Sequence, residues 1–374
     1  MNIEHLSLVD FRGFREISID LDPLGTTIIV GLNGTGKTTI LEAIAYLGTQ
    51  RSFRGSPKEA MIRVGCDRAI ARALLRRENT PINVEAELAT HGKSHIQVNR
   101  KNINSRRDLA LLLPVTTFSP GELDLIQGPP SKRREFLDDA LEIFNLESAT
   151  TIAEVEKILR QRAALLRSSG GRLTTEIEST LDVWDDRLSI KGQKLVVDRQ
   201  DFLCGIEPLV TTTYENLVSV VSQDYSAHSK KPTIRLEYQK SWSGSLREAL
   251  SSSRLDDLRR GANTIGPHRD DLVIFLDSRE ARTQASQGEQ RCIALALCLA
   301  VHLFIGESTR VKPILLLDDV FSELDPQRSQ ALLEQLPPGQ TLISTASPLP
   351  NITRESHIVD IQTVVGGESL GKNS

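Results

Sequence analysis

The sequence predicts an α/β fold in which a lobe with a mixed sheet, built from both ends of the chain, is interrupted by a mainly helical lobe. Near the N-terminus, a β-rich run at residues 26–30 ends in a glycine loop that opens onto a helix-like stretch, as an α/β unit begins. From about Ser131 the apolar spacing changes to that of helices, and a buried strand returns at residues 313–317. We therefore expect one lobe at residues 1–125 and 305–374, and the helical lobe at residues 126–304.

The composition is that of a folded globular chain. Of 374 residues, 39% are hydrophobic and 25% are charged, which excludes a disordered or collagen-like protein. The 45 Lys and Arg against 49 Asp and Glu give a net charge of −4, so any attraction to nucleic acid must come from a local basic face. The four cysteines form no CxxC pair and have no metal-ligand spacing, which argues against a zinc module and against a secreted disulfide scaffold. A protein of the reducing cytoplasm fits this pattern best. The cysteines are Cys66, Cys204, Cys292 and Cys298.

Neither export nor a membrane span is expected. The N-terminal segment carries Glu4 and Asp10 where a signal peptide needs a basic stretch followed by an apolar one. The longest apolar run, residues 293–305, is interrupted by His302 and is shorter than the roughly 18 residues that a span needs. It predicts a buried helix.

The N-terminal third alternates β-rich runs with turns. Residues 3–9 and 17–21 precede the strand at 26–30. After Arg68, three runs separated by turn residues predict an antiparallel sheet that flanks the α/β unit: 69–75, 82–88 and 95–98.

The helical lobe is expected to contain a short antiparallel hairpin. One apolar stripe with helical spacing includes a charged residue, Arg162, and ends at the Ser-Ser-Gly-Gly break of residues 168–171. A second stripe follows, and arms of about 20 to 25 residues would each reach ~30 to 38 Å. A third helix is expected at 203–221, then strands at 234–238 and 272–276. The stripes are Ile152, Val155, Leu159, Arg162 and Leu166, then Ile177, Leu181, Trp184 and Leu188.

A phosphate-binding loop follows the first α/β strand. Residues 31–38, GLNGTGKT, fit the pattern G-x-x-x-x-G-K-[ST] between a strand and a helix. In such a loop, backbone N–H groups turn inward around phosphates, Lys37 reaches the β- and γ-phosphates, and the Thr38 hydroxyl holds Mg²⁺. The alternative is a glycine-rich turn that matches by chance. The expected ATP-binding residues are Gly31, Asn33, Gly34, Thr35, Gly36, Lys37, Thr38 and Thr39.

An acidic pair is expected at the same edge of the sheet. The apolar run 313–317 ends in Asp318 and Asp319, as a buried parallel strand does when it delivers a carboxylate to its carboxyl end. Asp318 is placed to hold the metal together with Thr38, and Asp319 to act as a general base toward the attacking water. The alternative is an acidic strand end that only caps the next turn. We predict Lys37, Asp318 and Asp319 as the catalytic residues of ATP hydrolysis.

A third element separates ATPase classes. The segment 285–291, ASQGEQR, places Ser286 and Gly288 at the start of an apolar helix, where free N–H groups bind anions. An ordinary capping serine is the alternative. The sequence FSELD at 321–325 directly follows the acidic pair and favours the anion-binding interpretation.

Together these motifs resemble the ABC-type P-loop ATPase heads of the SMC family. The resemblance implies that the signature of one subunit closes on the ATP of its partner, and that a D-loop follows the acidic strand. The interval of 249 positions from Lys37 to Ser286 is longer than expected in a transporter ATPase and far shorter than a long-armed SMC protein needs. The implied signature residues are Ser286, Gln287, Gly288 and Glu289, and the D-loop residues are Ser322 and Asp325.

Five further blocks resemble the bacterial RecF family, in that family's order: DFRGF at 10–14, QRSFR at 50–54, FSPGEL at 118–123, GPPSKRREFLD at 128–138 and IGPHRDDL at 265–272. The resemblance implies a cytoplasmic, nucleoid-associated DNA-binding ATPase of recombinational and replication-gap repair. It implies dimerisation on ATP and work with RecO and RecR to load RecA. Arg12 is then expected near the nucleotide, a plain surface arginine being the alternative.

Three departures from transporter ATPases suggest slow, DNA-stimulated hydrolysis that acts as a timer. Glu289 stands where many ABC proteins carry Gln, and Ser119 and Glu122 stand in place of a Q-loop glutamine. Ser344, followed by a threonine, stands where a histidine often lies near the γ-phosphate.

A local basic excess predicts the DNA surface. Residues 51–107 hold 13 Lys and Arg against 5 Asp and Glu, an excess of +8. Phosphate contacts by such a patch are insensitive to base sequence. The alternative is that these cations pair with acidic parts of the chain. The expected DNA contacts, double-stranded, gapped or junction, are Arg51, Arg54, Arg100, Lys101, Arg106 and Arg107.

Other assignments stay open. His268 with Asp270 and Asp271 has the residue types of a metal site, but neighbours on an extended run point to opposite faces, which favours a structural or interface role. The cations at 132–134 fit a solvated helix start better than a DNA contact. Rival functions are the ATPase subunit of a membrane transporter, disfavoured by the long interval, and a small-molecule P-loop kinase, which leaves the signature unexplained.

Overall fold

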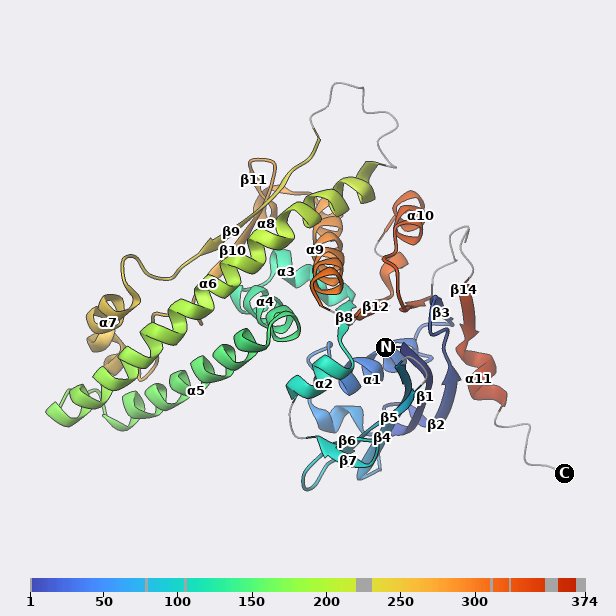
Figure 1. Ribbon diagram of the computed structural model, residues 1–374, viewed down its shortest axis with the longest axis horizontal. Helices are drawn as coiled ribbons and strands as arrows, with labels where there is room; N and C mark the ends of the chain where they lie inside the picture. The colour runs from blue at the N-terminus through green and yellow to red at the C-terminus, as the bar shows by residue number, and fades with distance from the viewer. Residues whose placement is uncertain are drawn as a thin grey trace. The chain divides into compact units, whose positions relative to one another are not determined.

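The computed structural model describes residues 2–77, 80–103, 106–219, 231–309, 312–322, 324–346 and 356–367. The chain divides into two compact units, each described by itself below (Figure 1). Unit 1 comprises Met1–Leu123, Thr212–Lys231 and Gln287–Ser374; unit 2 comprises Asp124–Thr211 and Pro232–Ser286.

Unit 1 contains strands of both senses, in two separate sheets. The first sheet is antiparallel, with the order β2-β1-β4-β5-β6-β7. Along β4 and β5, buried residues alternate with more exposed ones, which is the pattern of a sheet with one face on the core. Its strands are β1 (Asn2–Phe11), β2 (Phe14–Asp20), β4 (Arg68–Arg77), β5 (Thr80–Ala89), β6 (His95–Val98) and β7 (Lys101–Ile103).

The second sheet of unit 1 is parallel throughout, with the order β14-β3-β13-β12-β8. Its central strands are buried on both faces, and β12 is accordingly apolar up to its final residue, Asp318. Because the strands are parallel, the loops after β3, β13 and β12 leave the same edge. The strands are β3 (Thr26–Val30), β8 (Val115–Phe118), β12 (Ile314–Asp318), β13 (Thr341–Thr345) and β14 (Ser356–Asp360).

Helix α1 (Lys37–Thr49) joins the two sheets into one core. It packs against β4 of the antiparallel sheet and against β13 and β8 of the parallel sheet. Nearly every α1 side chain is buried, as expected for a helix covered on two sides. Among the described residues, unit 1 also contains η1 (Lys58–Met61), α2 (Arg106–Leu112), η2 (Pro120–Leu123), α9 (Gln287–Ser308), η4 (Val320–Ser322), α10 (Pro326–Glu334) and α11 (Ile361–Gly367).

Helix α9 is the apolar helix expected around residues 293–305. Its length and composition would suffice to cross a membrane, yet 67% of its apolar window is buried inside the fold. It packs against β8 and η2, which makes it a core helix of unit 1. This differs from the expected boundary at residue 304, which placed the helix in the helical lobe. An apolar helix buries its surface where a sheet face is available, and that face belongs to unit 1.

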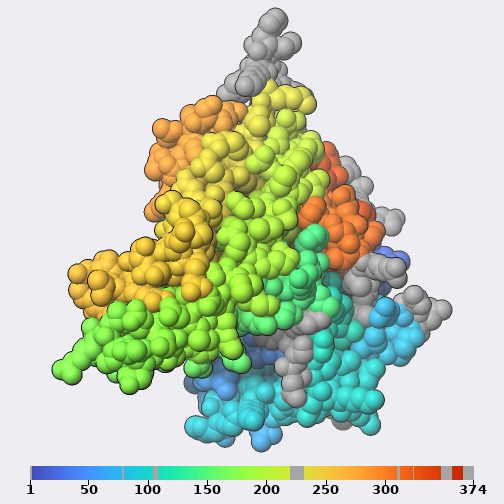
Figure 2. Space-filling view, turned by 60° about the vertical axis from the view of Figure 1, so that its left-hand side comes forward, coloured from blue at the N-terminus to red at the C-terminus, as the bar shows by residue number. Residues whose placement is uncertain are grey.

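Unit 2 contains the helical hairpin. Its short elements are α3 (Asp124–Gln127), α4 (Pro130–Phe144), α7 (Leu246–Arg260) and α8 (Ala281–Gln284), with a small antiparallel sheet of order β11-β10-β9. The strands are β9 (Ile234–Gln239), β10 (Asp271–Leu276) and β11 (Arg279–Glu280). Helix α5 (Leu146–Ser168) runs beside α6 (Thr175–Ser219), whose residues after Thr211 belong to unit 1 (Figure 1). Helix α7 packs on α5, and in the space-filling view its gold atoms lie against the green atoms of the hairpin (Figure 2).

The second arm is much longer than expected. Helix α6 has 45 residues and continues through the region where a separate third helix was predicted at 203–221, of which residues 220 and 221 lie outside the described part. Pro208 lies inside it and does not end it. Gly192 permits close packing, because a Cβ there would lie 2.8 Å from the Leu246 side chain. Burial of the helix's apolar face therefore outweighs these weak helix formers.

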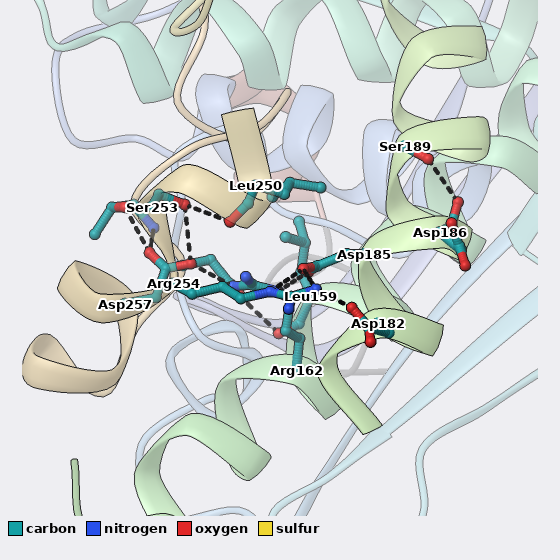
Figure 3. A network of polar contacts seen from close by, with 12 residues as sticks. Leu159, Arg162, Asp182, Asp185, Asp186, Ser189, Leu250, Ser253, Arg254 and Asp257 are labelled. Atoms are coloured by element: carbon teal, nitrogen blue, oxygen red, sulfur yellow. Dashed lines mark hydrogen bonds and ion pairs between the residues drawn. The ribbon is translucent and has the colours of Figure 1, made fainter. Parts of the chain in front are cut away.

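The charged residue of the first stripe, Arg162, is fully buried in unit 2 (Figure 3). Its Nε donates to Asp185 at 2.8 Å, and its Nη1 donates to Asp257 at 2.6 Å and to Asn263 at 2.8 Å. Arg254 of α7 donates to the second oxygen of Asp185 at 2.9 Å. A buried guanidinium with two buried carboxylates therefore ties α5, α6 and α7 together at the one charged position of the predicted stripe.

Candidate nucleotide site

The loop between β3 and α1 has the backbone that a phosphate cradle needs. Gly34 and Gly36 have φ angles of 82° and 100°, which favour glycine over any L-residue. At Gly36, a Cβ would also lie 2.3 Å from the ring of Phe14. Thr35 steadies the turn by donating to the Leu32 carbonyl at 2.8 Å, and Asn33 is exposed at its tip. The loop thus continues directly into the N-terminus of α1, where backbone N–H groups are free to bind phosphate.

Lys37 is buried and lies across this loop. Its ammonium donates to the carbonyls of Gly31 and Leu32, both at 2.8 Å. Thr39, another expected ligand, is buried on α1 two residues further along. The ammonium is therefore held at the loop that would receive the phosphates.

Thr38 and Asp318 meet at the carboxyl edge of the parallel sheet. The Thr38 hydroxyl donates to Asp318 Oδ1 at 2.8 Å. Ser344, at the end of β13, donates to the same oxygen at 2.6 Å. Burial raises the pKa of the Asp318 carboxyl, and the hydrogen bonds from Ser344 and Thr38 oppose that rise. A hydroxyl and a carboxylate oxygen beside a phosphate loop form a donor set suited to Mg²⁺.

Asp319 has a constrained backbone. Its φ is 47°, in the left-handed region that costs a non-glycine residue about 1 kcal/mol or more. Its N–H donates to Ser344 Oγ at 3.1 Å and to the Ser344 carbonyl at 3.0 Å. Within the described residues, its buried Oδ1 has no hydrogen-bond partner. A carboxylate oxygen held in this way is available to accept a proton.

Ser344 is the site residue whose role sequence reasoning missed. The sequence marked it only as standing in place of a histidine. In the structure it binds the side chain of Asp318 and the backbone of Asp319 together, because β13 lies between β3 and β12. The available signal was a polar pair, Ser344 and Thr345, at the end of a short run that contains Leu342 and Ile343.

Arg12 points its guanidinium at α1. Its Nε and Nη2 donate to the two oxygens of the fully buried Glu42 at 2.8 and 2.6 Å, and Nη2 also donates to Ser56 at 2.7 Å. Its φ of 55° is left-handed. Two of its nitrogens are thus engaged with the protein, and a contact with nucleotide stays a prediction.

The signature and the D-loop flank helices α9 and α10. Ser286 and Gln287 are exposed at the start of α9, and Gly288 and Glu289 are half-buried. The Ser322 hydroxyl donates to the Asp319 carbonyl at 2.7 Å. The next D-loop residue, at position 323, lies outside the described part of the chain. Asp325 caps α10 by accepting from the Arg328 N–H at 2.9 Å. Their approach to a partner's ATP stays a prediction.

The predicted DNA cations lie in three places along the chain. Arg51 and Arg54 are exposed after α1. Burial raises the pKa of the Asp318 carboxyl, and the charge of Arg54 is near enough to oppose that rise. Arg100 and Lys101 are exposed at the β6–β7 turn. The backbones of Arg106 and Arg107 begin α2, while their side chains lie outside the described part.

Cross-strand pairing removes part of the basic excess. Arg68 pairs with Glu87 at 2.7 Å, Arg72 pairs with Glu85, and Arg76 pairs with Glu4, each across neighbouring strands of the antiparallel sheet. These three arginines are therefore less available to phosphates than the count of charges suggests.

The block at 265–272 is built into the base of unit 2. Asp271 accepts two hydrogen bonds from Arg133, at 2.7 and 2.9 Å. Asp270 accepts from the Tyr238 hydroxyl at 2.7 Å, and burial lowers the pKa of His268 to about 4. No cluster of metal-ligating side chains occurs among the described residues. The same Arg133 belongs to the block at 128–138, so two of the sequence blocks meet here.

Comparison with known proteins gives consistent matches. A family model described as RecF/RecN/SMC N terminal domain matches residues 2–347. A protein of Streptomyces avermitilis named DNA replication and repair protein RecF is 37% identical over 93% of this chain and 94% of its own. A protein of the same name from Frankia alni is 35% identical over 93% of both chains.

Solved structures of similar proteins point to the same family. The recombination mediator protein RecF bound to ATP, described as part of the RecFOR pathway, matches with a TM-score of 0.83 and 25% identity over 96% of both chains. An SMC head bound to a winged-helix domain of ScpA matches with a TM-score of 0.54 at 16% identity, which shows the fold alone. A phosphate loop, an acidic strand and these relatives along nearly the whole chain lead to one conclusion: the chain belongs to the RecF/RecN/SMC N-terminal domain family and, within it, to the RecF proteins.

Proposed function

We propose that this chain is an ATP-dependent DNA-binding protein of recombinational repair and replication-gap repair. The observation that carries the proposal is the 2.8 Å hydrogen bond from Thr38 to Asp318, which brings the phosphate loop and the acidic strand into one site. Relatives named DNA replication and repair protein RecF support the biological setting.

Each residue of the site has its own role in the hydrolysis of ATP. Lys37 binds the β- and γ-phosphates, and the Thr38 hydroxyl and the Asp318 carboxylate would hold Mg²⁺. That ion would supply neutralisation of charge on the transferred phosphoryl group. Asp319 takes the proton of the attacking water, while the bond between the γ-phosphorus and the leaving ADP oxygen breaks.

Two chains act as a clamp. Each ATP is held by the P-loop of one chain and by the signature of the other, from Ser286 to Glu289, with the D-loop residues Ser322 and Asp325 beside it. DNA stimulates a weak hydrolysis that reopens the clamp, and Ser344 in place of a histidine supports a slow rate. The resemblance to RecF further supports RecO and RecR as partners, RecA loading as the outcome, and a cytoplasmic, nucleoid-associated protein.

Hydrolysis assays distinguish this function from its rivals. We expect gapped duplex DNA to raise ATP turnover and small-molecule acceptors to leave it unchanged. Light scattering should show a dimer with ATP and a smaller species with ADP or without nucleotide. Phosphorylation of a small molecule would favour the kinase, and turnover unresponsive to any DNA would reject the clamp.

A further inference from the structure

Arg328 lies beside the signature glycine of its own chain. The arginine stands in the first turn of α10, directly after the D-loop. A Cβ placed on Gly288 would lie only 3.3 Å from Arg328 Nη1. The guanidinium therefore fills the space next to the glycine of the signature, and a side chain at position 288 would have to displace it.

The guanidinium is incompletely paired by the chain. Its nearest charge partner is Asp325, with Nε 3.4 Å from Oδ2. Nε is buried, and within the described part of the chain it has no hydrogen-bond partner. The arginine side chain is 22% exposed, so it also reaches the surface. An arginine carries five N–H donors in a planar fork suited to phosphate, and these donors are not used up by Asp325.

Two carboxylates lie close to the signature glycine. Glu289 belongs to the signature itself, and Asp325 caps α10 nearby. Both acids and Arg328 act on the same buried thiol of Cys292: burial raises its pKa to about 11, Arg328 opposes that rise, and Asp325 and Glu289 add to it. A triphosphate approaching Gly288 would therefore meet two carboxylates, and like charges repel unless a cation lies between them.

We propose that Arg328 binds the terminal phosphate of the partner chain's ATP, as the cation of the composite site that offsets Glu289 and Asp325. The inference rests on the proposed clamp, in which Gly288 meets the partner's nucleotide. It adds to that clamp a residue outside the signature and the D-loop. The D-loop cap and the signature then share one arginine, so the two segments are presented to the partner together.

The first test separates binding in one chain from closure of two. ATP binding to dilute monomer and molecular mass by light scattering with ATP are measured for the parent, Arg328→Ala and Arg328→Lys. Arg15→Ala, which removes an exposed arginine of β2, is the matched control. We expect Arg328→Ala to bind ATP like the parent and to need at least tenfold more protein to dimerise on ATP, with Arg328→Lys between the two and the control unchanged.

The outcomes are distinguishable. Parent-like dimerisation of Arg328→Ala on ATP overturns the role of Arg328 and leaves the clamp standing. A parent that stays monomeric in ATP overturns the clamp, and this inference with it. Because Arg328→Lys retains the charge and the α10 cap, it tests the proposal even where the alanine variant folds poorly.

The second test asks whether the arginine acts across the dimer. Arg328→Ala chains are mixed with Lys37→Met chains, so a mixed dimer contains one site with an intact P-loop and an intact partner arginine. We expect ATP turnover of the mixture to exceed the sum of the separate chains. No gain, in conditions where Ser286→Arg mixed with Lys37→Met does gain, would place Arg328 outside the composite site.

Discussion

Thr38 and Asp318 stand 280 positions apart in the chain and share a hydrogen bond of 2.8 Å. The contact exists because β3 and β12 lie on either side of β13 in a parallel sheet, so their carboxyl ends meet at one edge. Ser344 completes the group from β13 itself. The chemistry of the site therefore depends on strand order as much as on the motifs.

Lys37 and Asp319 are expected to fail in different ways. Lys37→Met should weaken ATP binding, because the ammonium that neutralises phosphate charge is lost. Asp319→Asn should keep binding and lower turnover by about 10² to 10⁴, because the amide cannot accept the proton. Fluorescent-nucleotide titration and phosphate release measure the two steps. Normal hydrolysis by Asp319→Asn would remove this residue from the mechanism.

Ser286→Arg tests the signature. The substitution places a bulky cation where the partner's γ-phosphate is expected to dock. ATP should still bind each monomer, because the P-loop is untouched, but it should no longer drive dimerisation. Light scattering with ATP measures this, and a variant that dimerises like the parent contradicts the assignment of Ser286.

Ser344→Ala should move the acid limb of the pH profile of ATP turnover. Burial already raises the pKa of Asp318, and the Ser344 hydroxyl stabilises its charged form. Without that hydroxyl the pKa of Asp318 rises further. As the pH falls, the carboxylate that we propose to hold the metal is therefore protonated at a higher pH than in the parent. Turnover at saturating ATP between pH 5 and pH 9 would show it. Ser344→Thr, which keeps a hydroxyl, is the control, and superimposable profiles for alanine and parent would contradict the role.

Arg162→Leu should destabilise unit 2 strongly. The substitution leaves Asp257 buried without a cation and leaves Asp185 with Arg254 alone, a loss of about 3 to 5 kcal/mol. Arg160→Leu, two residues away, breaks only an exposed pair with Glu156 and should change the free energy of unfolding by less than about 0.5 kcal/mol. Urea unfolding compares them. If Arg162→Leu lowered the free energy of unfolding as little as Arg160→Leu does, the buried network would contribute no stability.

The DNA surface is tested by charge reversal. Lys101→Glu combined with Arg106→Glu and Arg107→Glu should weaken DNA binding at low salt for any base sequence. Each DNA phosphate that the variant no longer neutralises should reduce the log–log salt slope by about 0.9. Arg72→Ala should leave that slope unchanged, because this arginine is already paired with Glu85. Unchanged affinity in the triple variant, with folding and ATP binding intact, would move the DNA surface to the helical hairpin.

Much of the fold was predictable because its signals are local. The strands at 26–30 and 95–98 are found at the predicted residues, and the glycine loop lies between strand and helix as its pattern requires. The length of α6 was not predictable in the same way. Gly192 and Pro208 read as weak points, and only burial against neighbouring elements keeps the helix continuous.

The sequence by itself determined the phosphate loop and the acidic pair and predicted the signature, because contiguous residues specify a backbone path and a set of donors over a few positions. The tertiary structure decided what those residues touch. Strand order brought Ser344 within hydrogen-bond distance of both the Asp318 side chain and the Asp319 backbone. Cross-strand neighbours paired Arg68, Arg72 and Arg76 with glutamates. Helix packing enclosed Arg162 among aspartates. Contacts between residues far apart in the chain depend on the free energy of the whole packed unit, and no local pattern encodes that quantity.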